Sequence, residues 1–204
     1  MSETKPKRAT GTKEKILQVA CIKYLESGDK GLSMRAIAKD VGITPMAIYK
    51  HFANKEDLQN ELLLEAFRVF YSYLYPALKG ADAKQRFHIM TDGYFEFAAK
   101  QSAYFELIFL STNPMNNLKL KDVIREESTP SFRFLMDRVR DCMESRYFAQ
   151  GNVYEVSVAL LAQSTGLSAL YLSNSFGWDE DSAREMQRRI ISQVLAGFLT
   201  DKPG

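Results

Sequence analysis

Apolar residues recur every three or four positions along almost the whole chain, and no segment alternates apolar and polar residues over the length of a strand. A period of three to four is typical of amphipathic helices, because the buried stripe of a helix returns once per turn. Clear examples are the sets Ile16, Ala20, Tyr24 and Phe87, Met90, Tyr94, Phe97. The pattern predicts an all-α fold of about nine helices, without a confident strand.

Residues with strong terminal preferences indicate where the helices start and stop. Ser, Thr, Asn and Asp accept hydrogen bonds from the first free N–H groups of a helix, Pro suits its first turn, and Gly adopts the left-handed conformation that ends many helices. These signals predict helix ends at Gly28 or Gly31, Gly42, Pro76 and the loop 111–114, and helix starts at Ser33, Thr44 with Pro45, Asn54, Thr129 with Pro130, Asn152 and Asp179.

The most specific arrangement lies in residues 33–52, which read as a helix, a tight turn at Gly42 and a short second helix. This order is the helix-turn-helix unit, in which the first helix braces the second so that the second can enter the major groove of duplex DNA. The small side chain of Ala38 allows the two helices to cross closely, and a larger one would wedge them apart. The positions expected to be buried are Ile37, Ala38, Val41, Ile43 and Ile48.

The charge distribution favours a polyanionic partner for the amino-terminal part. Residues 1–60 hold 11 Lys and Arg against seven Asp and Glu, whereas residues 61–204 hold 16 against 18. A basic arm of Lys5, Lys7 and Arg8 precedes the first helix. Such a segment is typical of proteins that bind nucleic acid, although a soluble domain with a basic tail would show the same asymmetry.

The first 60 residues resemble the DNA-binding domain of the tetracycline-repressor (TetR) family of bacterial transcription regulators. The resemblance rests on Tyr24, Leu25 and Gly28, the runs 32–38 (LSMRAIA) and 41–43 (VGI), Ile48 with Tyr49, His51 with Phe52, and the run 54–58 (NKEDL). It implies two domains, an arm and helix-turn-helix unit over 1–54 and a helical ligand-binding and dimerisation domain over 55–204. It also implies a regulator, most often a repressor, whose partners are a double-stranded DNA operator and a small-molecule effector. The two cysteines, far apart and without a CxxC, fit a reducing compartment, so we expect the protein to be cytoplasmic.

The resemblance assigns DNA contacts by position. Ser33 and Thr44 occupy positions where a capping hydroxyl can also bond a phosphate, because the N–H groups of a helix amino end point at the DNA backbone. Tyr49 and Lys55 occupy positions that usually grip phosphates. The expected DNA-binding set is Ser33, Arg35, Thr44, Pro45, Met46, Ala47, Tyr49, Lys50, His51 and Lys55.

At the positions that read the groove, this chain departs from the small polar residues frequent in the family. Met46 and Ala47 offer few hydrogen bonds to bases, which favours apolar contact with thymine methyl groups and readout of DNA shape. Two other interpretations stay open here: Tyr49 as a core aromatic, and His51 as a helix-end residue without a DNA contact.

A strip of small residues follows one side of the helix expected from Asn152 to about Leu172. In the resembled family, the last two helices of each subunit pack against their symmetry mates as a four-helix bundle. We therefore expect a homodimer that places two recognition helices about one DNA turn (~34–36 Å) apart on a palindromic operator. The strip could instead pack inside its own subunit. The expected interface is Ala159, Ala162, Gly166, Ala169, Ser173, Met186, Ile190 and Val194.

Aromatic residues are concentrated in the middle of the expected effector domain. In the resembled family this is where a small molecule binds, although aromatic stripes at helical spacing are more often plain core. Few charges interrupt these faces, so any ligand is expected to be largely apolar or aromatic, with Tyr71, Tyr94 or Tyr104 as a hydroxyl partner. The expected lining is Phe67, Tyr71, Phe87, Tyr94, Phe97, Tyr104, Phe105 and Phe109.

Other functional classes lack their signatures. No GxSxG, Walker-type or GxGxxG motif is present, so an enzyme is not expected. Cys21 and Cys142 form no CxxC, and His51 and His88 complete no ligand set, so neither a metal nor a cofactor is expected. The longest aliphatic stretch, 158–162, is too short to span a membrane. The remaining alternative is a regulator of the same fold without a small-molecule effector, controlled by a protein partner or by its abundance.

Overall fold

The structure is a computed structural model that describes residues 11–111 and 118–198, with side chains described outside 118–129 and 196–198. Within these ranges the protein has nine α-helices and no strand, which confirms the predicted all-α class. The basic arm Lys5, Lys7 and Arg8, and positions 112–114 of the predicted loop, lie outside the described residues.

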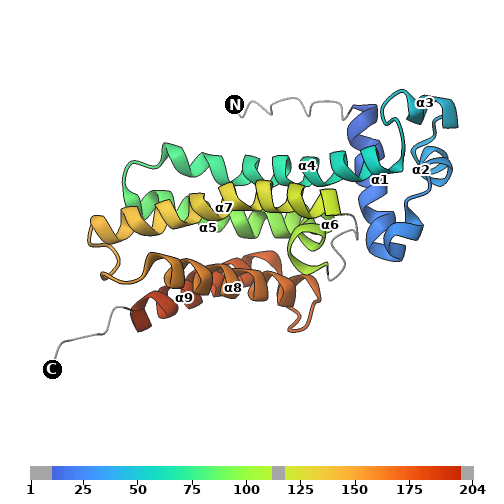
Figure 1. Ribbon diagram of the computed structural model, residues 1–204. Coiled ribbons are helices and arrows are strands. Elements are labelled where there is room, and N and C mark those ends of the chain that lie inside the picture. The colour runs from blue at the N-terminus through green and yellow to red at the C-terminus, as the bar shows by residue number, and fades with distance from the viewer. Residues whose placement is uncertain (1–10, 112–117, 199–204) are drawn as a thin grey trace, which may run out of the picture.

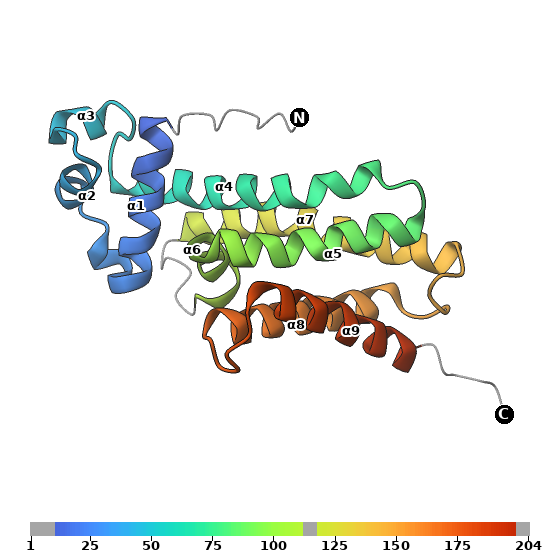
Figure 2. The same ribbon diagram turned by 180° about the vertical axis from the view of Figure 1, so that it is seen from behind.

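The helices divide into a small amino-terminal group and a larger layered body (Figures 1 and 2). Helices α1 to α3 gather at one end, α4 runs the length of the body, α5 and α7 lie beneath it, and α8 and α9 form the lowest layer. The elements are α1 (Thr12–Ser27), η1 (Gly28–Gly31), α2 (Met34–Val41), α3 (Pro45–Tyr49), α4 (Lys55–Leu74), η2 (Tyr75–Lys79), α5 (Ala83–Lys100), α6 (Ser102–Phe105), η3 (Glu106–Leu110), α7 (Leu118–Glu144), α8 (Val153–Leu172) and α9 (Glu180–Phe198).

Several helix starts follow directly from capping side chains in the sequence. Asn54 Oδ1 accepts a hydrogen bond from the Asp57 amide at 2.9 Å, and Asp57 in turn accepts one from the Ala53 amide at 2.8 Å. Asn152 accepts from the amides of Tyr154 and Glu155. These bonds satisfy N–H groups that have no partner inside the helix, which confirms the predicted starts of α4 and α8.

The predicted start of a helix at Thr129 and Pro130 is wrong, because α7 begins at Leu118 and carries Pro130 in its interior. Thr followed by Pro is a common helix start, but the backbone can also continue through a proline at the loss of one hydrogen bond. The α7 helix is therefore 27 residues long, the longest in the described part of the chain.

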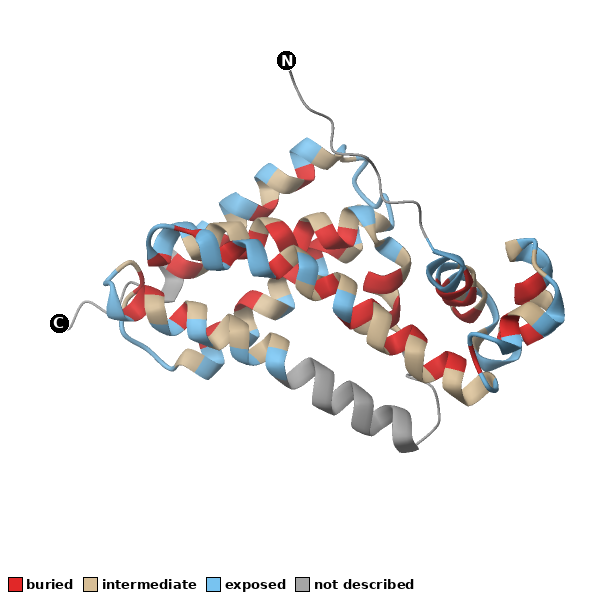
Figure 3. Cartoon of the chain, turned by 90° about the horizontal axis from the view of Figure 1, so that it is seen from above, coloured by how far each residue is buried: buried red, intermediate tan, exposed pale blue. Residues whose placement is uncertain are grey.

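One apolar core connects the two groups of helices. It runs from Ile16 and Ile37 in the amino-terminal group, through Leu58 and Leu62 on α4, to Phe97 on α5. Figure 3 shows the buried positions gathered along the helix faces that look toward one another. Because α4 contributes to the core over its whole length, it fixes the amino-terminal group relative to the body.

A close approach between two helices of the body depends on a glycine. A Cβ atom added to Gly93 on α5 would lie 2.1 Å from the carbonyl oxygen of Tyr73, in the last turn of α4. No side chain can move to relieve this contact, because the obstacle is backbone. Gly93 therefore sets the spacing between α4 and α5 along one wall of the body.

We expect Gly93→Ala to lower the free energy of unfolding by about 2 kcal/mol, in the range measured for overpacked cores. In thermal unfolding followed by circular dichroism, the melting temperature should fall by roughly 4–8 °C. Gly151→Ala is the matched control, since its added Cβ would meet only the Met143 methyl group at 3.8 Å. Equal melting temperatures for the two variants would contradict the proposed close contact.

Candidate functional site

Helices α2 and α3 form the predicted helix-turn-helix unit at the end of the molecule. Ile37, Ala38 and Ile48 are fully buried between these helices and the rest of the core, and Val41 and Ile43 are partly buried against it. All five positions predicted to face inward therefore do so. Because Ala38 is small, α2 and α3 cross with little space between them, which fixes the orientation of the short α3.

Local hydrogen bonds determine where each of the two helices starts and stops. The Ser33 hydroxyl accepts from the Ala36 amide at 3.4 Å, and the Thr44 hydroxyl accepts from the Ala47 amide at 3.1 Å. Between the helices, Gly42 adopts φ +79°, the left-handed region that glycine enters without steric cost. These contacts fix the turn between the two helices and the start of α3.

The side chains predicted to contact DNA lie together on the outer surface of this unit. Met46 has an exposed fraction of 73% and Tyr49 of 51%, which excludes the interpretation of Tyr49 as a core aromatic. Ala47 and Lys55 are half-buried. The other exposed members of the predicted set are Ser33, Arg35, Thr44, Pro45, Lys50 and His51.

Lys55 is the member of this set whose charge already has a partner. Its ammonium group donates to the Asp29 carboxylate at 2.6 Å and to the Asp29 carbonyl oxygen at 2.5 Å. The buried Gln59 side chain donates to the other oxygen of the same carboxylate. Asp29 thus connects η1 to the first turn of α4, and Lys55 helps to hold the amino-terminal group on the body.

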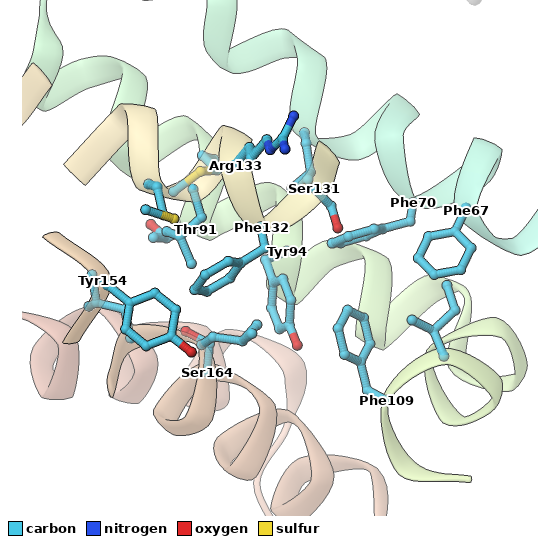
Figure 4. Close-up of a pocket in the computed structure, with 17 residues that line it drawn as sticks. Phe67, Phe70, Thr91, Tyr94, Phe109, Ser131, Phe132, Arg133, Tyr154 and Ser164 are labelled. Atoms are coloured by element: carbon cyan, nitrogen blue, oxygen red, sulfur yellow. The ribbon is translucent and has the colours of Figure 1, made fainter. Parts of the chain in front are cut away.

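A cavity of about 550 Å³ lies in the middle of the body. Helices α4, α5, α7 and α8 and the π-helical turn η3 all contribute side chains to its walls (Figure 4). Most of these side chains are aromatic or aliphatic, as expected for a site that takes an apolar small molecule. The lining consists of Phe67, Phe70, Leu74, Met90, Thr91, Tyr94, Ile108, Phe109, Ser131, Phe132, Arg133, Leu135, Met136, Tyr154, Leu160, Leu161 and Ser164.

Three of the eight residues predicted to line a pocket do line this cavity: Phe67, Tyr94 and Phe109. The other five have different surroundings. Phe87 packs edge-on against Phe148. Phe97 packs on Phe70 and Tyr73. Phe87 and Phe97 therefore belong to the solid core. Tyr104 and Phe105 are buried on α6, and Tyr71 stacks on Tyr75 at the outer side of α4. Helical periodicity identified these residues as buried or half-buried but not which of them face an open space.

The periodicity of the sequence did not indicate the part of the wall that α7 and α8 supply, including Phe132, Tyr154 and Ser164. The expected hydroxyl partners also differ, because Tyr71 and Tyr104 do not line the cavity. The Tyr94 hydroxyl is already paired with the Thr165 hydroxyl at 2.7 Å, and burial raises the pKa of Tyr94 well above its usual value. Tyr94 therefore stays neutral and contributes a packed ring to the wall.

The small-residue strip on α8, made of Ala159, Ala162, Gly166, Ala169 and Ser173, faces away from the core of its own subunit. Ala162, Gly166 and Ser173 are exposed, and a Cβ added to Gly166 would meet no atom within 4 Å. Val158 and Leu170 beside the strip are also exposed, and Met186, Ile190 and Val194 on α9 are half-buried. Small and apolar side chains of both α8 and α9 therefore remain accessible at the surface of the molecule.

A metal site, a membrane-spanning helix and a reactive cysteine each place a requirement on the described residues. No group of three His, Cys, Asp or Glu side chains in this part of the chain is arranged to hold a metal ion. No described helix is both long enough and apolar enough to cross a membrane. Cys21 and Cys142 are free and buried, and burial raises the pKa of each thiol to about 12.

Comparison with known proteins identifies relatives for most of the chain. Residues 16–62 match the family described as "Bacterial regulatory proteins, tetR family", and residues 87–194 match "Tetracyclin repressor-like, C-terminal domain". The negative transcriptional regulator IcaR of the biofilm operon icaADBC, from Staphylococcus epidermidis, is 26% identical over 194 residues, which cover 92% of this chain and 98% of IcaR.

Solved structures share the fold at lower sequence identity. The ketosteroid transcriptional regulator KstR2 of Mycobacterium tuberculosis superposes with a TM-score of 0.73 at 17% identity, over 95% of this chain and 98% of KstR2. The transcriptional regulator FadR from Bacillus subtilis, solved in complex with stearoyl-CoA, superposes with a TM-score of 0.72 at 18% identity, over 90% of this chain and 97% of FadR.

We expect Ala38→Leu to separate α2 from α3 and to lower the free energy of unfolding by about 1–3 kcal/mol, because the added atoms have no space in a fully buried position. Urea titration measures this change. Lys39→Leu adds the same side chain at the next, exposed position and should shift stability by less than about 0.5 kcal/mol. An Ala38→Leu protein as stable as its control would show that the helices are not tightly packed.

Proposed function

The chain belongs to the TetR family of transcriptional regulators, and we propose that it binds a palindromic operator as a homodimer and leaves it when an apolar ligand enters the cavity. The observation that carries this proposal is the double role of α4. Its first turn holds the amino-terminal group of helices through the pair of Lys55 with Asp29 in η1, and its second half lines the cavity through Phe67, Phe70 and Leu74.

The exposed surface of α3 supports binding in the major groove. Thr44 is exposed at the start of α3, where its hydroxyl is placed to meet a phosphate, and the exposed Tyr49 lies on the same short helix. Met46, the most exposed large hydrophobic side chain of the unit, presents a surface that fits thymine methyl groups. We therefore assign positioning to the phosphate contacts and base preference to Met46 with its neighbours Pro45 and Ala47.

The exposed apolar face of α8 and α9 supports the homodimer. The outward orientation of Gly166 would let α8 of a second subunit approach closely. In such a dimer the two α3 helices reach successive major grooves only at one separation, so a change in that separation weakens both contacts together. A domain division at residues 54 and 55 would then separate DNA contact from ligand binding and dimerisation.

Two structural connections support a coupling between the cavity and the DNA-binding unit. The first is α4 itself. The second runs through η3 and α6: Ile108 and Phe109 line the cavity, α6 packs against α1, and the Cys21 thiol donates to the Ala103 carbonyl oxygen at 3.4 Å. A ligand that prefers one position of these elements would shift the population of dimers toward one separation of the α3 helices.

The relatives agree with this proposal. IcaR is named a negative regulator, and FadR was solved with stearoyl-CoA, a ligand with a long apolar chain. A regulator without an effector would have no need for an apolar cavity of about 550 Å³, so the cavity favours the ligand-responsive function. We place its action in the cytoplasm, with the DNA that it binds.

The proposed DNA interface predicts that Tyr49→Ala weakens binding to all duplexes by roughly tenfold to a hundredfold, since each half-site loses one phosphate contact. A gel shift with the intergenic DNA beside the coding region measures this. Tyr75→Ala is the control, because Tyr75 has nearly the same exposed fraction, 53%, and lies at the other end of α4. Unchanged binding by a folded Tyr49→Ala protein would refute the assignment of α3.

The binding of the wild-type protein to DNA should weaken steeply as the salt concentration rises, as expected for about 6–10 phosphate contacts.

The proposed dimer predicts that Gly166→Leu converts the protein to monomers, because a branched side chain would separate the two α8 backbones. Sedimentation velocity at micromolar concentration measures the oligomeric state. Gly166→Ala keeps the strip small and should remain dimeric, and both variants should fold, since the position is open within the subunit. A Gly166→Leu protein that sediments as an unchanged dimer would place the interface elsewhere.

A further inference from the structure

The polar groups of the cavity wall fall into two classes, those that already have partners and those that do not. The Thr91 hydroxyl donates to the His88 carbonyl oxygen at 3.0 Å, and the Tyr94 hydroxyl is paired with Thr165. These two groups have their hydrogen bonds inside the protein, so a ligand gains little from them.

Ser164 belongs to the other class. It is buried, with an exposed fraction of 6%, it lines the cavity, and its hydroxyl has no hydrogen bond to any described residue. Its neighbour on the same helix, Ser157, donates to the Val153 carbonyl oxygen at 2.7 Å, as a serine inside a helix often does. The Ser164 hydroxyl is thus a donor and acceptor on a buried residue of the cavity wall, without a partner among the described residues.

A second hydroxyl without a partner among the described residues is on the same helix, but it belongs to an exposed side chain, that of Tyr154. Tyr154 lines the cavity, and its ring packs edge-on against Phe132 at 5.7 Å. Figure 4 shows the Tyr154 ring extended over the cavity with its hydroxyl on the α8 side, where Ser164 also lies. Helix α8 therefore contributes two hydroxyl groups to the cavity wall, whose other polar side chains come from α5 and α7.

The charge of the cavity wall restricts the ligand further. Arg133 is the one ionisable residue of the lining, apart from the tyrosines, and it is exposed rather than buried. No buried cation among the described lining residues is available to pair with an anion. A charged group placed deep in this site would lose its hydration without compensation, whereas a neutral oxygen would need only one hydrogen bond.

We propose that the effector is a largely apolar molecule that packs against aromatic rings and is uncharged inside the cavity. It carries one hydroxyl or carbonyl oxygen that is hydrogen-bonded to Ser164. This inference rests on the proposed function of the cavity as the effector site and adds the chemical class of the ligand. The rings of Phe67, Phe70, Phe109 and Phe132 supply its apolar contacts.

Three probes of one shape test the proposal: naphthalene, 2-naphthol and 2-naphthoate. At pH 7 the naphthol is neutral and the naphthoate is charged, because phenols lose their proton near pH 10 and carboxylic acids near pH 4. Dissociation constants are measured for the full-length protein by equilibrium dialysis with fluorescence detection. We expect 2-naphthol to bind about three- to tenfold more tightly than naphthalene, and 2-naphthoate to bind most weakly.

Two serine variants locate the hydrogen bond. Ser164→Ala should remove the advantage of 2-naphthol and leave the dissociation constant of naphthalene within twofold. Ser168→Ala is the matched control, because the Ser168 hydroxyl is also buried on α8 and without a partner but does not line the cavity. It should keep the full advantage of 2-naphthol. Far-UV circular dichroism checks that both variants are folded.

Three results would overturn the inference alone. These are equal binding of naphthalene and 2-naphthol, tightest binding of 2-naphthoate, and an advantage of 2-naphthol over naphthalene that Tyr154→Phe removes and Ser164→Ala does not. The proposed effector site would survive these three results, since the cavity would still take a ligand. Absence of binding by all three probes would overturn the inference and the proposed ligand site together, while operator binding in the gel shift would still support the DNA-binding function.

Discussion

The continuous burial of one face of α4 is the constraint on which the rest of the structure depends. Leu58 and Leu62 pack in the amino-terminal part of the core, and Phe67, Phe70 and Leu74 pack in the body. A helix of 20 residues has its backbone hydrogen bonds inside itself, so it transmits a displacement of one end to the other rather than absorbing it. For this reason the cavity and the amino-terminal group of helices are connected through one element.

The amino-terminal group is held on α4 by contacts of two kinds. Apolar burial at Leu58 and Leu62 supplies most of the free energy, because burying a leucine side chain contributes roughly 1.5–3 kcal/mol. The polar contacts of Asp29 with Lys55 and Gln59 contribute less, since Asp29 is largely exposed, but they are directional. Together they leave the group firmly attached while fixing the direction in which α3 projects.

The aromatic residues of the body serve two purposes that periodicity alone does not separate. Phe97 and Phe105 are completely buried and pack ring against ring, which gives the body its rigidity. Phe67 and Phe109 have one side in that core and the other toward the cavity. The wall of the cavity is therefore backed by packed rings, and the space persists because these rings cannot collapse into it without breaking their contacts.

The sequence by itself determined the helices, most of their boundaries, and the helix-turn-helix unit with its exposed side chains. These features depend on residues within about four positions of one another, as with Ser33 and the Ala36 amide, or Asn54 and the Asp57 amide. Only the tertiary structure decided that Tyr154 and Ser164 meet Phe67 around one cavity, that Lys55 pairs with Asp29, and that a helix runs through Pro130. Such contacts depend on which faces of distant helices come together, and the spacing of apolar residues records that a face is buried but not what lies against it.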